Sequence, residues 1–171
     1  MDESETEPAG RRESALMATT ILLGVLQRAY KAAADKAVAH LGISQAQAWP
    51  LLMIGRHGNG ARQGAIAELL GIEGPTLVRS LDQLVAAGLV ERQEDAADRR
   101  ARTLHLTPAG SEMRGHIEKS LHQLRAALFE GVPDDDVAAC LRVFATLEQR
   151  LGRVMPRMPI AAARVRVPEK Q

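Results

Sequence analysis

The sequence predicts a mainly α-helical fold that contains one small β-hairpin and has long helices towards both ends. Three observations support this prediction. Apolar residues recur at helical spacing along most of the 171 residues, the period changes to two only between residues 89 and 107, and no internal repeat interrupts this order. Hydrophobic residues make up 46% of the chain, which is enough for a core, but aromatic residues make up only 2%, so the core must be aliphatic.

Composition limits the compartment and the partners. The net charge of +1 does not by itself indicate a nucleic-acid partner, so any electrostatic argument depends on where the charges point. The single cysteine, Cys140, excludes an intrachain disulfide and fits a reducing compartment; within an apolar helix it is expected to be an inert core thiol. An acidic N-terminus and the lack of an apolar run of about 18 residues predict a cytoplasmic protein with no membrane partner.

The N-terminal region divides into a tail and a long helix. Residues 1–13 are polar and have no apolar period, which predicts a disordered tail. Residues 14–41 keep a helical period, with apolar positions at Leu22, Leu26, Tyr30, Ala33, Ala37 and Leu41. A helix of this length needs an extended apolar partner, and a small domain supplies only part of it. Self-association is therefore expected.

A second helix is predicted after Ser44, which forms a capping box with Gln47. Pro50 lies inside this helix and should bend it, because it removes one hydrogen bond. The glycine-rich segment 55–60, GRHGNG, is interpreted as a plain turn. It has neither the Lys-Ser/Thr of a phosphate loop nor the GxGxxG spacing of a dinucleotide site.

Two short helices follow, and together they predict a helix-turn-helix. The first covers residues 63–70 and ends at Gly71, and the second begins at Gly74-Pro75, where a proline loses no hydrogen bond. The apolar stripe of the second helix, which should be buried, consists of Leu77, Leu81, Leu84 and Val85. The opposite, outward side carries Thr76, Arg79 and Gln83.

A two-stranded hairpin is predicted between residues 89 and 107. Leu104 and Leu106 alternate with polar residues as in a half-buried strand, and Leu89 begins the partner strand. The segment 94–100, EDAADRR, is too charged to be buried and brings Arg99 and Arg100 to the tip. A reading helix followed by an arginine-tipped hairpin is a winged helix-turn-helix, a shape suited to a nucleic-acid duplex.

Two further helices and a tail complete the chain. One helix begins at Thr107-Pro108 and the other after the break at residues 131–133. Their apolar seams consist of Met113, Ile117, Leu121, Leu124 and Leu128, and of Val137, Leu141, Phe144, Leu147 and Leu151. The predicted organisation is a disordered tail (1–13), a dimerisation helix (14–41), a winged helix-turn-helix lobe (42–107), two dimerisation helices (108–152) and a basic tail (153–171).

The segment GIEGPTLVRSLDQLVAAGLVERQEDAADRRARTLHLTPAG resembles the DNA-binding core of the MarR family of bacterial transcription regulators, and of its SlyA-like branch in particular. The resemblance extends from about residue 44 to residue 110 and includes the D-x-R of Asp98 and Arg100. It implies a homodimer, joined through its N- and C-terminal helices, that binds a pseudo-palindromic operator. It also implies that Arg79 is the arginine of the reading helix, and that Arg99 and Arg100 are wing arginines that reach the minor groove.

Physical reasoning gives these residues the same roles. A guanidinium can donate to O6 and N7 of guanine in the major groove, which suits Arg79. It can also enter a narrow A·T-rich minor groove, which suits Arg99 and Arg100, with the carboxylate of Asp98 steering one of them. The candidate DNA-binding set is completed by helix residues that can reach phosphates or base edges: Pro75, Thr76, Ser80 and Gln83. Arg92 is equally consistent with a structural ion pair to a nearby acid.

The resemblance further implies a small effector, often a phenolic or other aromatic acid, that binds between the dimer helices and the DNA-binding lobe and weakens operator binding. Candidate pocket residues are aromatic or cationic side chains of the first two helices: Tyr30, His40, Trp49, Arg56 and His57. The alternative is that Tyr30 and Trp49 only pack in the core and that His57 is a turn residue.

No enzyme, cofactor or metal site is expected. The sequence has no nucleophile and base at a known motif spacing, and its five histidines show no i, i+4 pairing. The sequence therefore predicts a ligand-responsive, DNA-binding transcription regulator, a repressor whose partners are double-stranded DNA, a second copy of the chain and a small effector. The alternative is a helical protein–protein interaction module whose winged helix does not bind DNA.

Overall fold

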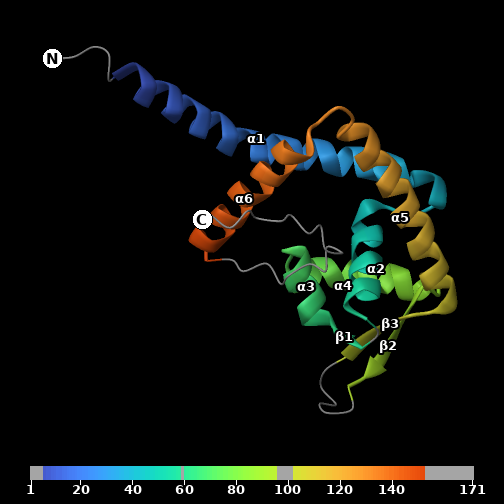
Figure 1. The fold of residues 1–171 in the computed structure, drawn as a ribbon. Helices are drawn as coiled ribbons and strands as arrows, with labels where there is room; N and C mark the ends of the chain where they lie inside the picture. The colour runs from blue at the N-terminus through green and yellow to red at the C-terminus, as the bar shows by residue number, and fades with distance from the viewer. Residues whose placement is uncertain (1–5, 59, 96–101, 153–171) are drawn as a thin grey trace, which may run out of the picture.

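Figure 1 shows a computed structural model of the protein, in which residues 6–58, 60–95 and 102–152 are described. The predicted winged helix-turn-helix fold is confirmed: the structure is mainly helical and holds one small antiparallel sheet. The long first helix lies across the upper part of the view, and its N-terminal part projects beyond the rest of the chain (Figure 1). The winged helix-turn-helix lobe lies below it.

Helix α1 spans Thr6–Val38 and is followed by a short 3-10 helix, η1, at Ala39–Leu41. The expectation of a disordered tail is wrong for residues 6–13, which are helical; residues 1–5 lie outside the described residues. Once the apolar part of α1 has nucleated the helix, each added turn costs little, and Pro8 is tolerated because it lies in the first turn. The missing apolar period was therefore a poor guide to where the helix begins.

Helix α2, Gln45–His57, is the central helix of the fold. It packs against α1, the sheet and three later helices: α3 (Gln63–Leu70), α4 (Gly74–Ala86) and α5 (Pro108–Leu128). Its N-terminus is capped as predicted, because the side-chain Oε1 of Gln47 accepts from the backbone N–H of Ser44 at 2.9 Å. The interpretation of residues 55–60 as a turn is wrong for residues 55–57, which continue the helix. Glycine suits position 55 because a Cβ there would clash with the side chain of Arg114 on α5.

The helix-turn-helix consists of α3, Gln63–Leu70, and α4, Gly74–Ala86. Gly71 closes α3 with φ of 62°, a left-handed conformation that glycine adopts without strain. Both helices lie close to their predicted bounds. The turn between them is therefore short, and it brings α4 across α2, whose apolar side covers the buried stripe of α4.

The sheet has three strands in the order β1-β3-β2, all antiparallel. Strands β2, Val90–Glu94, and β3, Arg102–Leu106, form the predicted hairpin, with Val90 opposite Leu106 and Glu94 opposite Arg102. The third strand, β1 at Ala61–Arg62, was not predicted, since two residues are too few to show a period. It ties the start of α3 to the wing.

Helices α5, Pro108–Leu128, and α6, Asp134–Arg150, complete the fold. The core lies where the C-terminal part of α1, α2, α3, α4, α5 and the sheet meet, and its fully buried large side chains are Val38, Pro50, Leu51, Ile54, Ile66, Leu77, Leu81, Leu84, Val90, Leu104, Ile117 and Leu121. No large aromatic ring is among them, as the composition predicted. In contrast, α6 buries no residue against the described part of its own chain.

Candidate nucleic-acid interface

Helix α4 places one face in the core and the other in solvent. Leu77, Leu81 and Leu84 are fully buried, whereas Pro75, Thr76, Arg79 and Gln83 are exposed, as the helical spacing predicted. Pro75 lies in the first turn, where its missing N–H breaks no helical hydrogen bond. The exposed polar side chains follow one another along the outward side of a single helix, the arrangement by which a helix reads a major groove.

The structure contradicts the prediction for Ser80. This residue is only 8% exposed, because the offset of three from Leu77 puts it on the buried side of α4. Its hydroxyl therefore does not belong to the outward set. Val85 departs in the opposite direction: it was expected in the buried stripe but is 36% exposed.

Ion pairs neutralise most of the described arginines of the lobe. Arg92 Nη1 lies 2.6 Å from Asp82 Oδ1, Arg62 Nε lies 2.7 Å from Asp95 Oδ2, and Arg102 Nη1 lies 3.2 Å from Glu94 Oε1. The structural ion pair considered for Arg92 is therefore confirmed. Arg79 is different, since it is exposed and has no ion pair with any residue that the structure describes.

Asp82 was not among the predicted site residues. Its place one turn beyond Arg79 on the outward half of α4 is visible in the helical spacing, but an acid there only acquires meaning once its partner on β2 is known. Asp98, Arg99 and Arg100, the predicted wing residues, lie outside the described residues.

A network of contacts at the start of α5 fixes the base of the wing relative to α4. The hydroxyl of Thr107 donates to the carbonyl oxygen of Gly88 at 2.7 Å and accepts from the N–H of Gly110 at 2.9 Å. The backbone N–H of Thr107 also donates to the carbonyl of Leu89 at 3.2 Å. One residue thus connects the end of α4, the exit from β3 and the first turn of α5.

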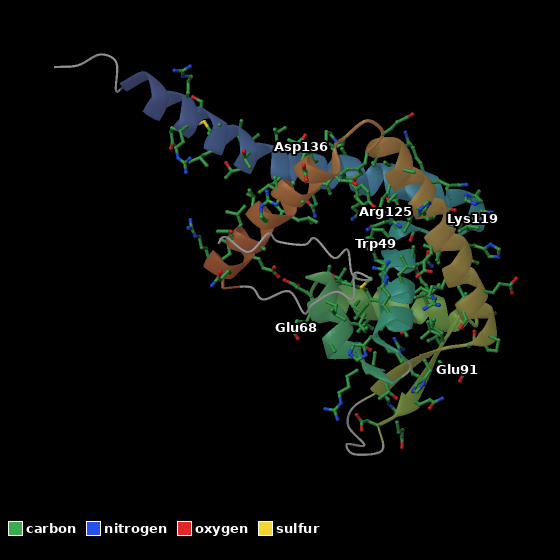
Figure 2. The ribbon with its side chains drawn as sticks, viewed as in Figure 1. Trp49, Glu68, Glu91, Lys119, Arg125 and Asp136 are labelled. Carbon is green, nitrogen blue, oxygen red and sulfur yellow. The ribbon has the colours of Figure 1, made fainter. Side chains whose placement is uncertain are left out.

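The candidate effector residues are only partly brought together. Tyr30 and Trp49 are both half-buried, with ring centroids 6.5 Å apart and planes inclined by 31°, and Figure 2 labels Trp49 on α2. Arg56 and His57 lie two turns further along α2, about 11 to 12 Å away along its axis. His40 lies in η1 and is exposed, as is His57. The structure therefore unites the two aromatic rings but not the whole set.

Cys140 is exposed on α6, so the expectation of a core thiol is wrong for this chain. The α6 seam does not pack into the core of its own protomer, and the thiol remains at the surface with it. Of the described helices, none combines the length and the apolar character that crossing a membrane requires.

Comparison with known proteins gives a consistent result. Residues 41–101 match the sequence model of the MarR family. The solved structure of the transcriptional regulator PA3341 is 36% identical, with a TM-score of 0.72 over 78% of this chain and 98% of that chain. SlyA is 19% identical, with a TM-score of 0.70 over 78% and 93% of the two chains. CouR from Rhodococcus jostii RHA1, solved with p-coumaroyl-CoA, is 23% identical, with a TM-score of 0.67 over 77% and 90%.

The fold and the outward face of α4 thus define a winged helix-turn-helix protein. The chain belongs to the MarR family, whose members are transcriptional regulators and not enzymes. Its likeness to SlyA and CouR extends to the fold alone at these identities, so the assignment to a SlyA-like branch stays a prediction.

Proposed function

We propose that this regulator binds a pseudo-palindromic operator as a homodimer and acts as a repressor that an aromatic effector releases from DNA. The observation that carries the proposal is the division of α4. Its buried face is locked into the core by Leu77, Leu81 and Leu84, while its exposed face offers an arginine that no described acid neutralises. A rigid helix with such a face is what sequence-specific reading of a major groove requires.

Within this proposal, Arg79 donates to a guanine edge or a phosphate, and Thr76 and Gln83 contact neighbouring phosphates or bases. Pro75 starts the helix near the backbone of the duplex. Arg99 and Arg100 contact the adjacent minor groove, with Asp98 orienting one of them. These wing contacts remain proposals from the sequence.

Homodimerisation is supported by apolar side chains that the protomer leaves exposed on α1, on α6 and the residue after it, and from the end of α5 to the start of α6. The exposed side chains are Leu16, Met17, Ile21, Leu22, Leu23, Val25, Leu26, Leu128, Phe129, Val132, Leu141, Val143, Phe144 and Leu151. So many exposed large apolar side chains are unusual on a soluble monomer, and they favour an interface. We accordingly assign residues 14–41 and 108–152 to dimerisation and residues 42–107 to DNA binding.

An aromatic effector is supported by the Tyr30–Trp49 pair, which lies where α1 meets α2, between the proposed dimer helices and the lobe. CouR was solved with p-coumaroyl-CoA, a ligand that carries a phenolic ring. The protein has one conformation that fits the operator and another that does not. A ligand at this place releases DNA only if its affinity for the second conformation is higher than its affinity for the first.

A salt titration of duplex binding tests the proposal. The wild-type chain should lose affinity steeply as salt rises, and Arg79→Ala should weaken binding by about 1–3 kcal/mol if Arg79 reads a base, or lower the salt slope by about 0.9 if it contacts a phosphate. Lys119→Ala is the matched control, because it removes the same charge from an exposed residue on the outer side of α5 (Figure 2). Binding that ignores salt and Arg79 would instead favour the helical interaction module.

A further inference from the structure

Among the residues that the structure describes, one ion pair joins the wing directly to the reading helix. Arg92 lies on β2 opposite Leu104 of β3, and its Nη1 reaches Oδ1 of Asp82 on α4 at 2.6 Å. The two residues are ten positions apart and belong to the two elements that must contact one duplex together. Their contact therefore fixes the position of β2 relative to α4. It does not stabilise either element on its own.

The guanidinium of Arg92 depends on this one carboxylate. Its Nε and Nη2 are shielded from solvent and have no hydrogen-bond partner among the described residues, although the side chain as a whole is 29% exposed. Shielded donors without partners are costly, and a shielded cation that loses its counter-charge is costlier still. The Asp82 carboxylate therefore fixes where the Arg92 side chain, and with it β2, lies against α4.

Asp82 is otherwise difficult to explain on a helix that approaches a polyanion. Its side chain is 56% exposed and follows Arg79 by one turn, so a free carboxylate there would repel phosphates. Electrostatics alone would favour almost any neutral residue at this position. A carboxylate that lowers the affinity for DNA at this position must contribute in another way. Its ion pair with Arg92 indicates that this contribution is to orient the wing.

We propose that Asp82 and Arg92 are positioning residues for operator binding: their ion pair holds the wing at the angle from which wing and reading helix reach the same duplex. This inference rests on the proposed DNA binding. It extends that proposal by assigning a role in specific binding to two residues that need not touch the DNA. The second ion pair, between Arg62 and Asp95, ties the wing to the start of α3 and limits its movement on the other side.

The direction in which one substitution changes the affinity for the operator distinguishes a positioning role from a simple charge effect. Asp82→Asn removes a negative charge near DNA, so electrostatics alone predicts tighter binding to every duplex. Positioning predicts the opposite for the operator: weaker binding by roughly tenfold, the size of effect that coupled charged residues show. Glu94→Gln is the matched control, since the described ion pair of Glu94 lies within the wing, with Arg102 on the paired strand, and not with a residue of α4.

The experiment uses the full chain and an operator duplex selected by the wild-type chain from random DNA, with a scrambled duplex as the non-specific reference. Affinity, salt slope and thermal midpoint are measured for Asp82→Asn, Arg92→Gln, the double variant, Asp82→Glu and Glu94→Gln. We expect Asp82→Asn to lower operator affinity and the salt slope without weakening scrambled-duplex binding. The double variant should be no worse than the poorer single variant, and Asp82→Glu should recover part of the loss.

Three outcomes are decisive. A fall in the ratio of operator to scrambled affinity for Asp82→Asn, but not for Glu94→Gln, supports positioning, because partial unfolding would lower both affinities together. Unchanged or tighter operator binding by Asp82→Asn overturns it. A wild-type chain that selects no duplex at all sinks the proposed function itself, an outcome distinct from the failure of the ion pair.

Discussion

Gly110, in the first turn of α5, packs so closely against the carbonyl oxygen of Leu89 that no side chain fits between them. A Cβ built at Gly110 would overlap that oxygen and would lie 2.9 Å from the carbonyl carbon. Leu89 precedes the wing and Gly110 follows it, so this contact closes the base of the hairpin. The hydrogen bonds of Thr107 to Gly88 and Gly110 hold the same junction from within.

We therefore expect Gly110→Ala to destabilise the protein by about 2 kcal/mol or more, because either α5 or the Leu89 backbone must move. Gly115→Ala is the matched control on the same helix, where a Cβ meets nothing within 4 Å. It should raise stability by about 0.5–1 kcal/mol, as glycine-to-alanine changes in helices do. Urea unfolding of both variants measures the difference, and equal stabilities would contradict the close contact.

The exposed seam of α6 predicts an obligate assembly. Phe144 is 43% exposed in the protomer, and placing a carboxylate there by Phe144→Asp would bury an unpaired charge in the proposed interface. We expect this variant to elute as a monomer or to lose solubility, as should removal of residues 1–41. Ile72→Asp changes a side chain of similar exposure, 37%, in the lobe and should leave the dimer intact. A Phe144→Asp variant that sizes as a normal dimer would place the interface elsewhere.

Trp49 is the only tryptophan of the chain, so its fluorescence reports directly on the candidate effector site. We expect p-coumarate or p-coumaroyl-CoA to change this fluorescence saturably and to weaken operator binding over the same concentration range, since the two equilibria are linked. Tyr30→Leu should weaken the response by removing the neighbouring ring. Saturable binding that leaves operator affinity unchanged would assign the Tyr30–Trp49 pair to packing.

Local patterns predicted the lobe well because its elements are short and strongly amphipathic. The period of four in α4 separated Leu77 and Leu81 from Arg79, and glycines marked the ends of α3 and α4. The errors arose where the decisive contact is distant in sequence. Gly55 leaves room for the side chain of Arg114 on α5, and the two-residue strand β1 is defined by its pairing with β3.

The candidate site was predictable to the same degree. Helical spacing predicts that Arg79 and Gln83 are exposed. It places the edge of the buried face only to within about one residue, so it could not show that Ser80 is buried. The partner of Arg92 could be any of several nearby acids, and only the packing of β2 on α4 selects Asp82. Cys140 was misplaced because helical spacing shows that α6 has an apolar seam but not whether that seam packs into the core of its own protomer.

Selection of bound fragments from random duplex DNA tests the central claim most directly. The wild-type chain should enrich an inverted repeat whose half-sites lie about one helical turn apart, and Arg79→Ala should relax the preference at one position of each half-site. Enrichment of no sequence at low salt, or a preference that Arg79→Ala leaves untouched, would contradict the account.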